Sequence, residues 1–596
     1  MQAMTSIPTT DIKTETRVYS DFAGIDLVHN LVNLNRSPEA LNVWINYDEE
    51  DGRPIETRNG MTLQGDFGGA IYGIHFYKKS DTTYCLIHSG DKLLLWSNYP
   101  TLPATTSELK ASGMNTAIST SFVFNEILYI RDGLNYLQYD GTDLETVQDN
   151  ATIPTTSINM NPDGSPFVSE NDTSYQMVNL LQPKRKNSFV ADGESTEFYL
   201  DTQDLDPVGT FVMTAVVNGV NLIETTGFTV DRTLGKVTFS VAPSAPATPG
   251  QDNVVITLSK TISGYADRIL KCTVAKEFDS RIFFAGNDSY KSYVFSGELN
   301  DPTYIGDLNY WPCGTETNKT KALIPGNSVL WVIKEANQNS PSVYYLTPTL
   351  SDTYGKIYPA SQSNVTTGCS STGINFGDDI VFMGNEGLKA IASSDIKSEN
   401  LLGHRSSLID EKMINDTNFT SCLMEEYKGY LLCLINSHIY LADSRQRWSN
   451  AETKSTEYEW YYWELPNTIN YFKVYQNTLY LGNADGNVYI YSGTTDDGLS
   501  ISSYWATPHD FFGTEVLQKT TSKKGSISRC SGDVKVSASI DRKEYKEIET
   551  FGNVDDYIVF KKKLKKARTI SYKLSSLSSM KIYSVTTVVY IGGYIK

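Results

Sequence analysis

The chain contains 596 residues, too many for one small core, so we expect two to four domains or one large repeat domain. The formal net charge is -18, which argues against a protein that wraps nucleic acid over its whole surface. No apolar run approaches the ~18–20 residues that a bilayer-spanning helix needs, so membrane insertion is not expected.

The composition favours β structure. Aromatic residues make up 12% of the chain, and flat aromatic side chains fit pleated, half-buried surfaces. The 42 glycines supply turn positions, and no heptad pattern of long helices is visible. The seven cysteines are odd in number and show no C-x-x-C spacing, which disfavours a disulfide framework or a zinc site and predicts folding in a reducing cytosol.

Residues 1–61 predict an N-terminal arm followed by a β-hairpin. Residues 1–17 are polar and lack the apolar core of a signal peptide. Ser37-Pro38-Glu39 is typical of a helix start, with Pro in the first turn. Residues 42–47 then predict a strand, and residues 55–58 predict its short return.

Residues 62–180 predict the first propeller blades and a linker. Apolar residues alternate with polar ones at 71–79, 83–98 and 121–141, which predicts strands joined by short turns. Residues 145–180 are rich in Thr, Asn, Ser and Pro, as is typical of a linker.

Residues 184–262 predict an inserted β-sandwich. Asp192-Gly193, Asn218-Gly219 and Leu234-Gly235 mark turns between short runs in which apolar and polar residues alternate. A compact series of such runs is the pattern of two small packed sheets.

The hairpin pattern returns over residues 266–500. Residues 281–286 and 290–296 predict two strands around the turn at Asn287-Asp288. Similar hairpins recur at a spacing of roughly 40–60 residues, as four-stranded propeller blades require. The whole chain therefore predicts an all-β fold with a β-propeller of seven blades, six to eight being possible.

Residues 501–596 predict a basic C-terminal β-sandwich. Between Lys519 and Lys596 there are 17 Lys and Arg against 7 Asp and Glu, a net charge of +10, so the remainder carries -28. This basic unit could be a docking face for an acidic neighbour. The alternative is a solvated, charged β-edge that resists aggregation.

Two clusters are candidate interface residues. Trp460, Tyr461 and Trp463 lie in an aromatic run that could stack sugars or bases or anchor a partner, although a blade strand packed on both faces is the alternative. A lysine run could contact DNA phosphates or an acidic partner ring, although a hairpin with a solvated Lys edge is the alternative. This run comprises Lys561, Lys562, Lys563, Lys565 and Lys566.

The sequence contains no recognisable catalytic constellation, so we expect no enzymatic activity, no cofactor and no metal. The six histidines form no metal-ligand spacing, and no P-loop or G-x-S-x-G motif is present. His509-Asp510 lacks a paired nucleophile. Acidic pairs at Asp378-Asp379, Glu425-Glu426 and Asp496-Asp497 leave a propeller glycosidase open as an alternative.

Several segments resemble a known family. Phe22-Ala23-Gly24-Ile25, then Asn42 and Gly52-Arg53 to Arg58-Asn59-Gly60, are similar to the opening of tailed-phage structural proteins, although Phe-Ala-Gly stands here for the usual Phe-Gly-Gly. Residues 280–287 and 296–310 (SGELNDPTYIGDLNY) resemble a blade signature of the same proteins. The chain thus resembles the tail nozzle, hub or packaged-DNA stabilisation proteins with a β-propeller body.

The resemblance implies a virion component rather than an enzyme. Such proteins form a homo-oligomeric ring, often six-fold, below the portal and adaptor, where they retain packaged double-stranded DNA and open for its ejection. An acidic channel wall would let DNA slide without sequence specificity. The implied location is the virion tail, after assembly in the host cytoplasm. A baseplate or receptor-binding propeller that recognises host glycan is the alternative.

Overall fold

The computed structural model describes residues 13–48, 52–167, 175–337, 341–352, 355–393, 400–450, 455–522 and 524–594. Regular structure in these ranges is almost entirely strand, which confirms the predicted all-β class. The helical elements there are single turns: α1 (Val147–Asn150), α2 (Asp267–Leu270), α3 (Asp410–Ile414) and the 3₁₀ turn η2 (Phe419–Ser421).

Seven four-stranded antiparallel sheets occur in the described ranges, and they are the blades of the predicted β-propeller. The first three in chain order are β6–β9 (Ile71–Lys79, Thr82–Ser89, Lys92–Trp96, Thr106–Lys110), β10–β13 (Thr120–Phe124, Ile127–Arg131, Tyr136–Tyr139, Leu144–Thr146) and β22–β25 (Val274–Phe278, Arg281–Ala285, Tyr293–Ser296, Tyr310–Pro312).

The next three blades follow without interruption. They are β26, β27, β28 and β31 (Thr320–Gly326, Val329–Lys334, Val343–Leu346, Ala360–Gln362), β32–β35 (Gly373–Phe376, Asp379–Gly384, Gly387–Ser393, Asn400–His404) and β36–β39 (Leu423–Tyr427, Tyr430–Ile435, His438–Ser449, Thr456–Glu464). A small hairpin, β29–β30 (Thr349–Ser351, Gly355–Ile357), projects from the first of them.

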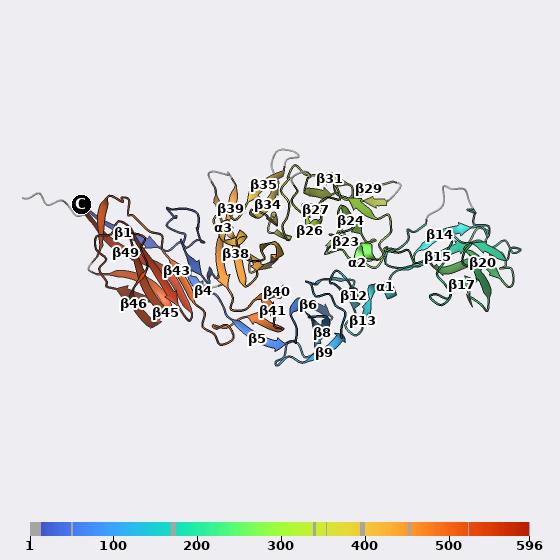
Figure 1. Ribbon diagram of the computed structural model, residues 1–596, viewed down its shortest axis with the longest axis horizontal. Coiled ribbons are helices and arrows are strands. Elements are labelled where there is room, and N and C mark those ends of the chain that lie inside the picture. The colour runs from blue at the N-terminus through green and yellow to red at the C-terminus, as the bar shows by residue number, and fades with distance from the viewer. Residues whose placement is uncertain are drawn as a thin grey trace, which may run out of the picture. The chain divides into compact units, whose positions relative to one another are not determined.

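The last blade combines strands from distant parts of the chain. Strands β40 (Ile469–Tyr475), β41 (Thr478–Asn483) and β42 (Asn487–Tyr491) are completed by β5 (Met61–Asp66), which pairs antiparallel with β42. Figure 1 shows the blue β5 beside the orange β40 and β41. An early strand therefore closes the blade that ends the propeller, so the ring does not rely on a sequential hairpin for its closure.

The inserted β-sandwich is also confirmed. One sheet contains β14 (Thr155–Met160), β15 (Lys184–Phe189), β17 (Thr214–Val217), β18 (Val220–Ile223) and β21 (Val254–Ser259); the other contains β16 (Glu197–Tyr199), β19 (Phe228–Asp231) and β20 (Lys236–Phe239). Phe189, Phe198 and Phe239 meet edge to face between them, with ring centroids 5.4 and 5.2 Å apart. The sandwich therefore has its own aromatic core.

The C-terminal domain includes the N-terminal strands. Strands β1 (Lys13–Tyr19), β2 (Ala40–Leu41), β3 (Val43–Ile45) and β4 (Ile55–Thr57) join β43–β49 in a sandwich whose long strands change partners along their length. In Figure 1 the blue β1 and β4 lie among the red strands. The later strands are β43 (Ser503–Ala506), β44 (Leu517–Thr521), β45 (Ser526–Ile540), β46 (Lys546–Val554), β47 (Tyr557–Phe560), β48 (Ile570–Ser576) and β49 (Met580–Tyr594).

This interlocking corrects two of the predictions for the N-terminal part. The described part of residues 1–61 is not a separate arm and hairpin, because β1 and β4 both pair with β49. The predicted helix at Ser37 does not form. Instead, the Ser37 hydroxyl donates to the carbonyls of Glu39 and Ala506, and the chain then enters β2.

The predicted linker over residues 145–180 is also partly wrong. It contains α1 and β14, and β14 pairs in parallel with β15 as part of the inserted sandwich. Residues 49–51, between the two predicted strands, lie outside the described residues. The strand predictions at 42–47 and 55–58 are confirmed as the shorter β3 and β4.

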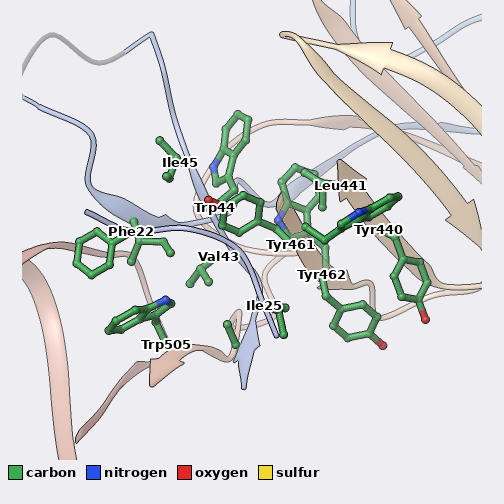
Figure 2. Close-up of a cluster of buried hydrophobic side chains, with 14 of the residues drawn as sticks. Phe22, Ile25, Val43, Trp44, Ile45, Tyr440, Leu441, Tyr461, Tyr462 and Trp505 are labelled. Atoms are coloured by element: carbon green, nitrogen blue, oxygen red, sulfur yellow. The ribbon is translucent and has the colours of Figure 1, made fainter. Parts of the chain in front are cut away.

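The chain divides into two compact units. The first comprises residues 1–76, 85–108 and 369–596, and the second comprises residues 77–84 and 109–368. The core of the first unit is rich in aromatic side chains, and Figure 2 shows Trp44, Tyr461 and Trp505 within it. Trp44 packs edge to face on Trp463, with ring centroids 5.5 Å apart.

Candidate functional site

The predicted aromatic interface is wrong. Trp460, Tyr461 and Trp463 are 0%, 1% and 0% exposed, so they cannot anchor a partner in this structure. They belong to β39, whose two faces both pack inside the first unit, as the alternative of a blade strand anticipated. The indole N–H of Trp460 donates to the Arg405 carbonyl at 2.7 Å, which adds a polar contact to this packing.

The segments on which the predicted resemblance rests form contacts between distant parts of the chain. Here the opening motif means residues 22–60. Gly24 lies against β39: an added Cβ would sit 2.4 Å from both the nitrogen and the oxygen of Trp460. Gly60 is equally constrained, since its Cβ would lie 1.9 Å from the Thr495 carbonyl oxygen. Only glycine allows the backbone to approach this closely.

Arg58 is the central polar residue of the opening motif. Its guanidinium donates to the two carboxylate oxygens of Asp496 at 2.8 and 2.6 Å, and to the Asn42 side chain at 3.0 Å. It also donates to the carbonyls of Asn59 and Glu464, so all its donors are used. The side chains of Arg58 and Asp496 are 1% and 6% exposed, and such a fully bonded pair fixes the register of the segments it joins.

Asn42 makes similar contacts with the end of strand β39 and with the start of the C-terminal domain. Its side-chain oxygen accepts the Glu464 N–H at 2.8 Å, and its amide donates to the Ser502 carbonyl at 2.9 Å. The Asn42 backbone has φ of +54°, a left-handed conformation that Asn tolerates better than most residues. The opening motif therefore ties β39, β43 and the last blade together within the first unit.

The segment Asn300–Tyr310 has a corresponding role in the second unit. The Pro302 carbonyl accepts the Tyr136 hydroxyl from the preceding blade at 3.0 Å. The Tyr304 hydroxyl donates to the Met177 carbonyl at 2.8 Å, beside the end of the inserted sandwich. This segment therefore connects the blade β22–β25 to the preceding blade and to the inserted sandwich.

Asn179 is the key partner of that segment, and the sequence offered no signal for it. It is 1% exposed and uses both ends of its amide. The nitrogen donates to the carbonyls of Thr152 and Thr303, both at 2.9 Å, and the oxygen accepts the N–H groups of Leu181 and Ile305. One side chain thus joins the chain entering the insertion, the connection between β14 and β15, and the Asn300–Tyr310 segment.

The acidic pairs are used for internal contacts. Asp379 accepts from Arg405 at 3.0 Å and from the Tyr458 hydroxyl at 2.5 Å. Burial alone would raise the pKa of Asp379, but these donors outweigh it and the pKa is lowered. Glu425 pairs with Lys473, and Asp496 with Arg58. One carboxylate of each acidic pair is therefore engaged in a contact within the chain.

His509 and Asp510 do not form a catalytic dyad. The Asp510 carboxylate accepts from Arg17 at 2.9 Å and from the Tyr19 hydroxyl at 3.1 Å, so it fastens β1 to the C-terminal domain. Burial lowers the pKa of His509. No group of three His, Cys, Asp or Glu residues suited to a metal ion occurs in the described ranges, and no helix there is long and apolar enough to cross a membrane.

The lysine run forms an exposed loop between β47 and β48, not the edge of a hairpin. Strands β47 and β48 both pair with β45 and not with each other. We call residues 561–568 the basic loop. It is held at Leu564, which is 6% exposed and exchanges two hydrogen bonds with Thr521, at 3.0 Å from N–H to carbonyl and 2.9 Å from N–H to hydroxyl.

A second anchor lies at Ala567, which exchanges backbone hydrogen bonds of 3.1 and 2.8 Å with Lys519. Leu564 and Ala567 point into the protein, whereas the lysine side chains around them point to solvent. Five lysines are exposed on this loop, and none forms an ion pair with a carboxylate in the described part of the chain. These are Lys561, Lys562, Lys563, Lys565 and Lys566.

A polar cavity of about 270 Å³ lies in the second unit, between the blades β10–β13 and β22–β25. Asn115, Asp132, Lys271 and Ser289 are among its lining residues. Arg131 lies at its buried side, where its Nη2 donates to the carbonyls of two residues before β22 and its guanidinium packs 4.8 Å from the centroid of the Phe284 ring. Burial lowers the pKa of Arg131.

The sequence matches no protein-family model and no curated protein. Among solved structures, the computationally designed Ika8 protein is 10% identical with a TM-score of 0.30, covering 72% of this chain and 99% of that one. BamB from Moraxella catarrhalis is 10% identical with a TM-score of 0.30, covering 73% and 97%. The WD40 domain of SCAP from fission yeast is 9% identical with a TM-score of 0.22, covering 71% and 96%.

Proposed function

We propose that this chain is a structural protein of a phage tail. In this proposal it forms a homo-oligomeric ring, a nozzle or hub below the portal and adaptor, that retains packaged double-stranded DNA and gates its ejection. It acts in the virion tail after assembly in the host cytoplasm, without enzymatic activity or a cofactor, and without insertion into a membrane.

One observation carries the proposal: the residues on which the resemblance to phage tail proteins rests are also the residues that make contacts between distant parts of the chain. The N-terminal segment packs on blade strand β39 at Gly24, and on the residues after the last blade at Arg58 and Gly60. In the second unit, the Pro302 carbonyl contacts the preceding blade and the Tyr304 hydroxyl contacts the inserted sandwich. A protein that holds DNA under pressure needs such stabilising contacts between distant segments more than it needs a reactive cleft. The acidic pairs, which a glycosidase would need, are engaged in structural contacts.

Imaging tests this function. The purified chain, alone and mixed with the portal and adaptor proteins of the same genome, is examined as single particles. A six- or twelve-fold ring that docks coaxially below the portal is the expected result. Mass spectrometry of purified virions should find the chain as a stoichiometric tail component. A monomer that never docks and is missing from virions would refute the proposal.

A second candidate, recognition of host glycan by a baseplate or receptor-binding propeller, is favoured by the polar cavity beside Asp132. Side chains of Asn, Asp and Lys around a cavity of about 270 Å³ suit a sugar's hydroxyl groups. A glycan array distinguishes the two functions: specific binding by the monomer that is lost in Asp132→Ala supports glycan recognition, whereas ring assembly without glycan binding supports the tail nozzle.

A further inference from the structure

An exposed apolar loop emerges from the opening motif. We call residues 27–35 the apolar loop. Four of its side chains are exposed: Leu27, Val28, Leu31 and Leu34 are 39%, 57%, 59% and 37% exposed. Apolar residues that gather on the surface in one short segment are typical of an interaction site, since isolated exposed apolar residues are ordinary but clustered ones are not.

The base of the apolar loop is held rigidly. The backbone of Ala23 donates to Asn35 at 2.7 Å, and Asp26 donates to Ser37 at 2.9 Å, which closes the loop. Directly after it, Arg36 is bound to Glu459 with contacts of 3.0 and 2.5 Å and lies 4.4 Å above the Trp448 ring. A loop fixed in this way loses little conformational entropy when a partner binds it.

The apolar loop and the basic loop meet through one turn of the C-terminal domain. The Arg542 guanidinium donates to the Asn30 carbonyl of the apolar loop at 2.8 Å. The neighbouring Asp541 carboxylate accepts the Arg568 N–H of the basic loop at 2.6 Å. The two loops therefore flank the same turn within the first unit. One carries exposed apolar side chains and the other five exposed lysines, of which Lys562 also donates to the Glu547 carbonyl at 2.9 Å.

The geometry points to a docking surface for a second copy of this chain, formed by the apolar loop and the basic loop together. A DNA backbone would use the lysines but would leave Leu31 and its apolar neighbours in water, whereas a protein surface can cover both. Charge complementarity identifies the copy as the partner: the chain outside residues 519–596 carries -28, against +10 within them.

The contact must be head to tail. A two-fold contact through this surface would bring together two patches of the same positive charge, which is repulsive. A heterologous contact, in which the basic loop faces the acidic body of the next copy, avoids this and produces a ring when the rotation closes. The inference rests on the proposed ring and names the surface through which it would assemble.

Sedimentation velocity of the full chain tests the inference at several protein concentrations and between about 0.1 and about 1 M NaCl, over which the Debye length falls from about 10 Å to about 3 Å. Wild type should associate, and more weakly at high salt. The double variant Lys563→Glu/Lys565→Glu and the single variant Leu31→Asp should each weaken association at least about tenfold, while the melting temperature stays unchanged.

Matched controls lie elsewhere on the surface. Lys78→Glu/Lys271→Glu makes the same charge change outside the basic loop, and the ion pair of Lys271 with Asp267 joins two side chains that are 56% and 52% exposed. Leu350→Asp makes the same apolar-to-acidic change at a residue that is 81% exposed. Both controls should associate as tightly as wild type or more tightly.

Other outcomes overturn the inference in distinguishable ways. Association that survives both loop variants refutes this surface but leaves the ring standing. A wild-type chain that stays monomeric refutes the second copy as partner, and lysine-dependent binding to duplex DNA or to vesicles with anionic lipid would then assign the surface to a polyanion. Loop-dependent association of a chain that is absent from virions refutes only the proposed function.

Discussion

The guanidinium of Arg58 binds both carboxylate oxygens of Asp496, at 2.8 and 2.6 Å, with both side chains almost fully buried. These residues stand 438 positions apart in the sequence. Their contact joins the end of the opening motif to the turn that follows the last blade. Removing this contact therefore tests whether the opening motif stabilises the fold.

Replacing Arg58 with Ala should destabilise the protein by about 3–5 kcal/mol, because it leaves a buried carboxylate without its partner. Urea unfolding followed by tryptophan fluorescence measures the change. The control is Lys92→Ala, which removes a surface ion pair with Glu108 whose side chains are 45% and 51% exposed, and should cost less than about 1 kcal/mol. Equal effects of the two variants would show that Arg58 does not fasten the chain.

Replacing Gly24 with Ala should cost about 1–3 kcal/mol or more, because the new Cβ meets the Trp460 backbone at 2.4 Å and one chain must move. Gly592→Ala is the matched control: it lies in β49 of the same unit, with nothing within 4 Å of the added Cβ. Differential scanning calorimetry should show a lower melting temperature for the first variant only. A Gly24→Ala protein as stable as wild type would contradict the close packing.

Replacing Asn179 with Ala should destabilise the second unit strongly. The variant leaves the buried N–H groups of Leu181 and Ile305 without partners, at a cost of about 1–3 kcal/mol each, and two part-buried carbonyls lose a donor as well. Limited proteolysis should then cut sooner near residues 151–180. Gln138→Ala provides the comparison, since it removes one exposed contact with the Glu145 carboxylate in the same unit. If both variants resist protease equally, the Asn300–Tyr310 segment is fastened by other contacts.

His75 should make the protein sensitive to acid. Burial, with repulsion from His88 and Lys473, lowers the pKa of His75 to about 3. The unfolded chain has the ordinary value of about 6.5, so between these pH values only the unfolded state binds the proton. Stability is therefore full above about pH 6.5 and falls toward about pH 3, by about 1.4 kcal/mol per pH unit.

Unfolding free energies measured across this range should fall less steeply for His75→Gln than for wild type, while above about pH 7 the two proteins should show the same pH dependence. Parallel curves throughout the acid range would mean that other groups cause the loss.

Much of the fold could be predicted because strand signals are local. Alternating apolar residues and the turn at Asn287-Asp288 predicted one blade hairpin, and repetition of that pattern predicted the propeller. The Asn300–Tyr310 segment was noted only for its resemblance, and its contact with Tyr136 of the preceding blade is visible only in the structure. The partner Asn179 could not be predicted, because one Asn in a Thr- and Pro-rich stretch gives no local signal.

The sequence by itself determined the all-β class, the repeated blades, the inserted sandwich and the basic character of the C-terminal part, since these follow from periodicity and composition. Only the tertiary structure decided that β5 closes the last blade, that β1 and β4 belong to the C-terminal domain, that Trp460 is buried and that Lys561 begins an exposed loop. The physical reason is that pairing between distant strands depends on register and complementary packing, which no local pattern contains.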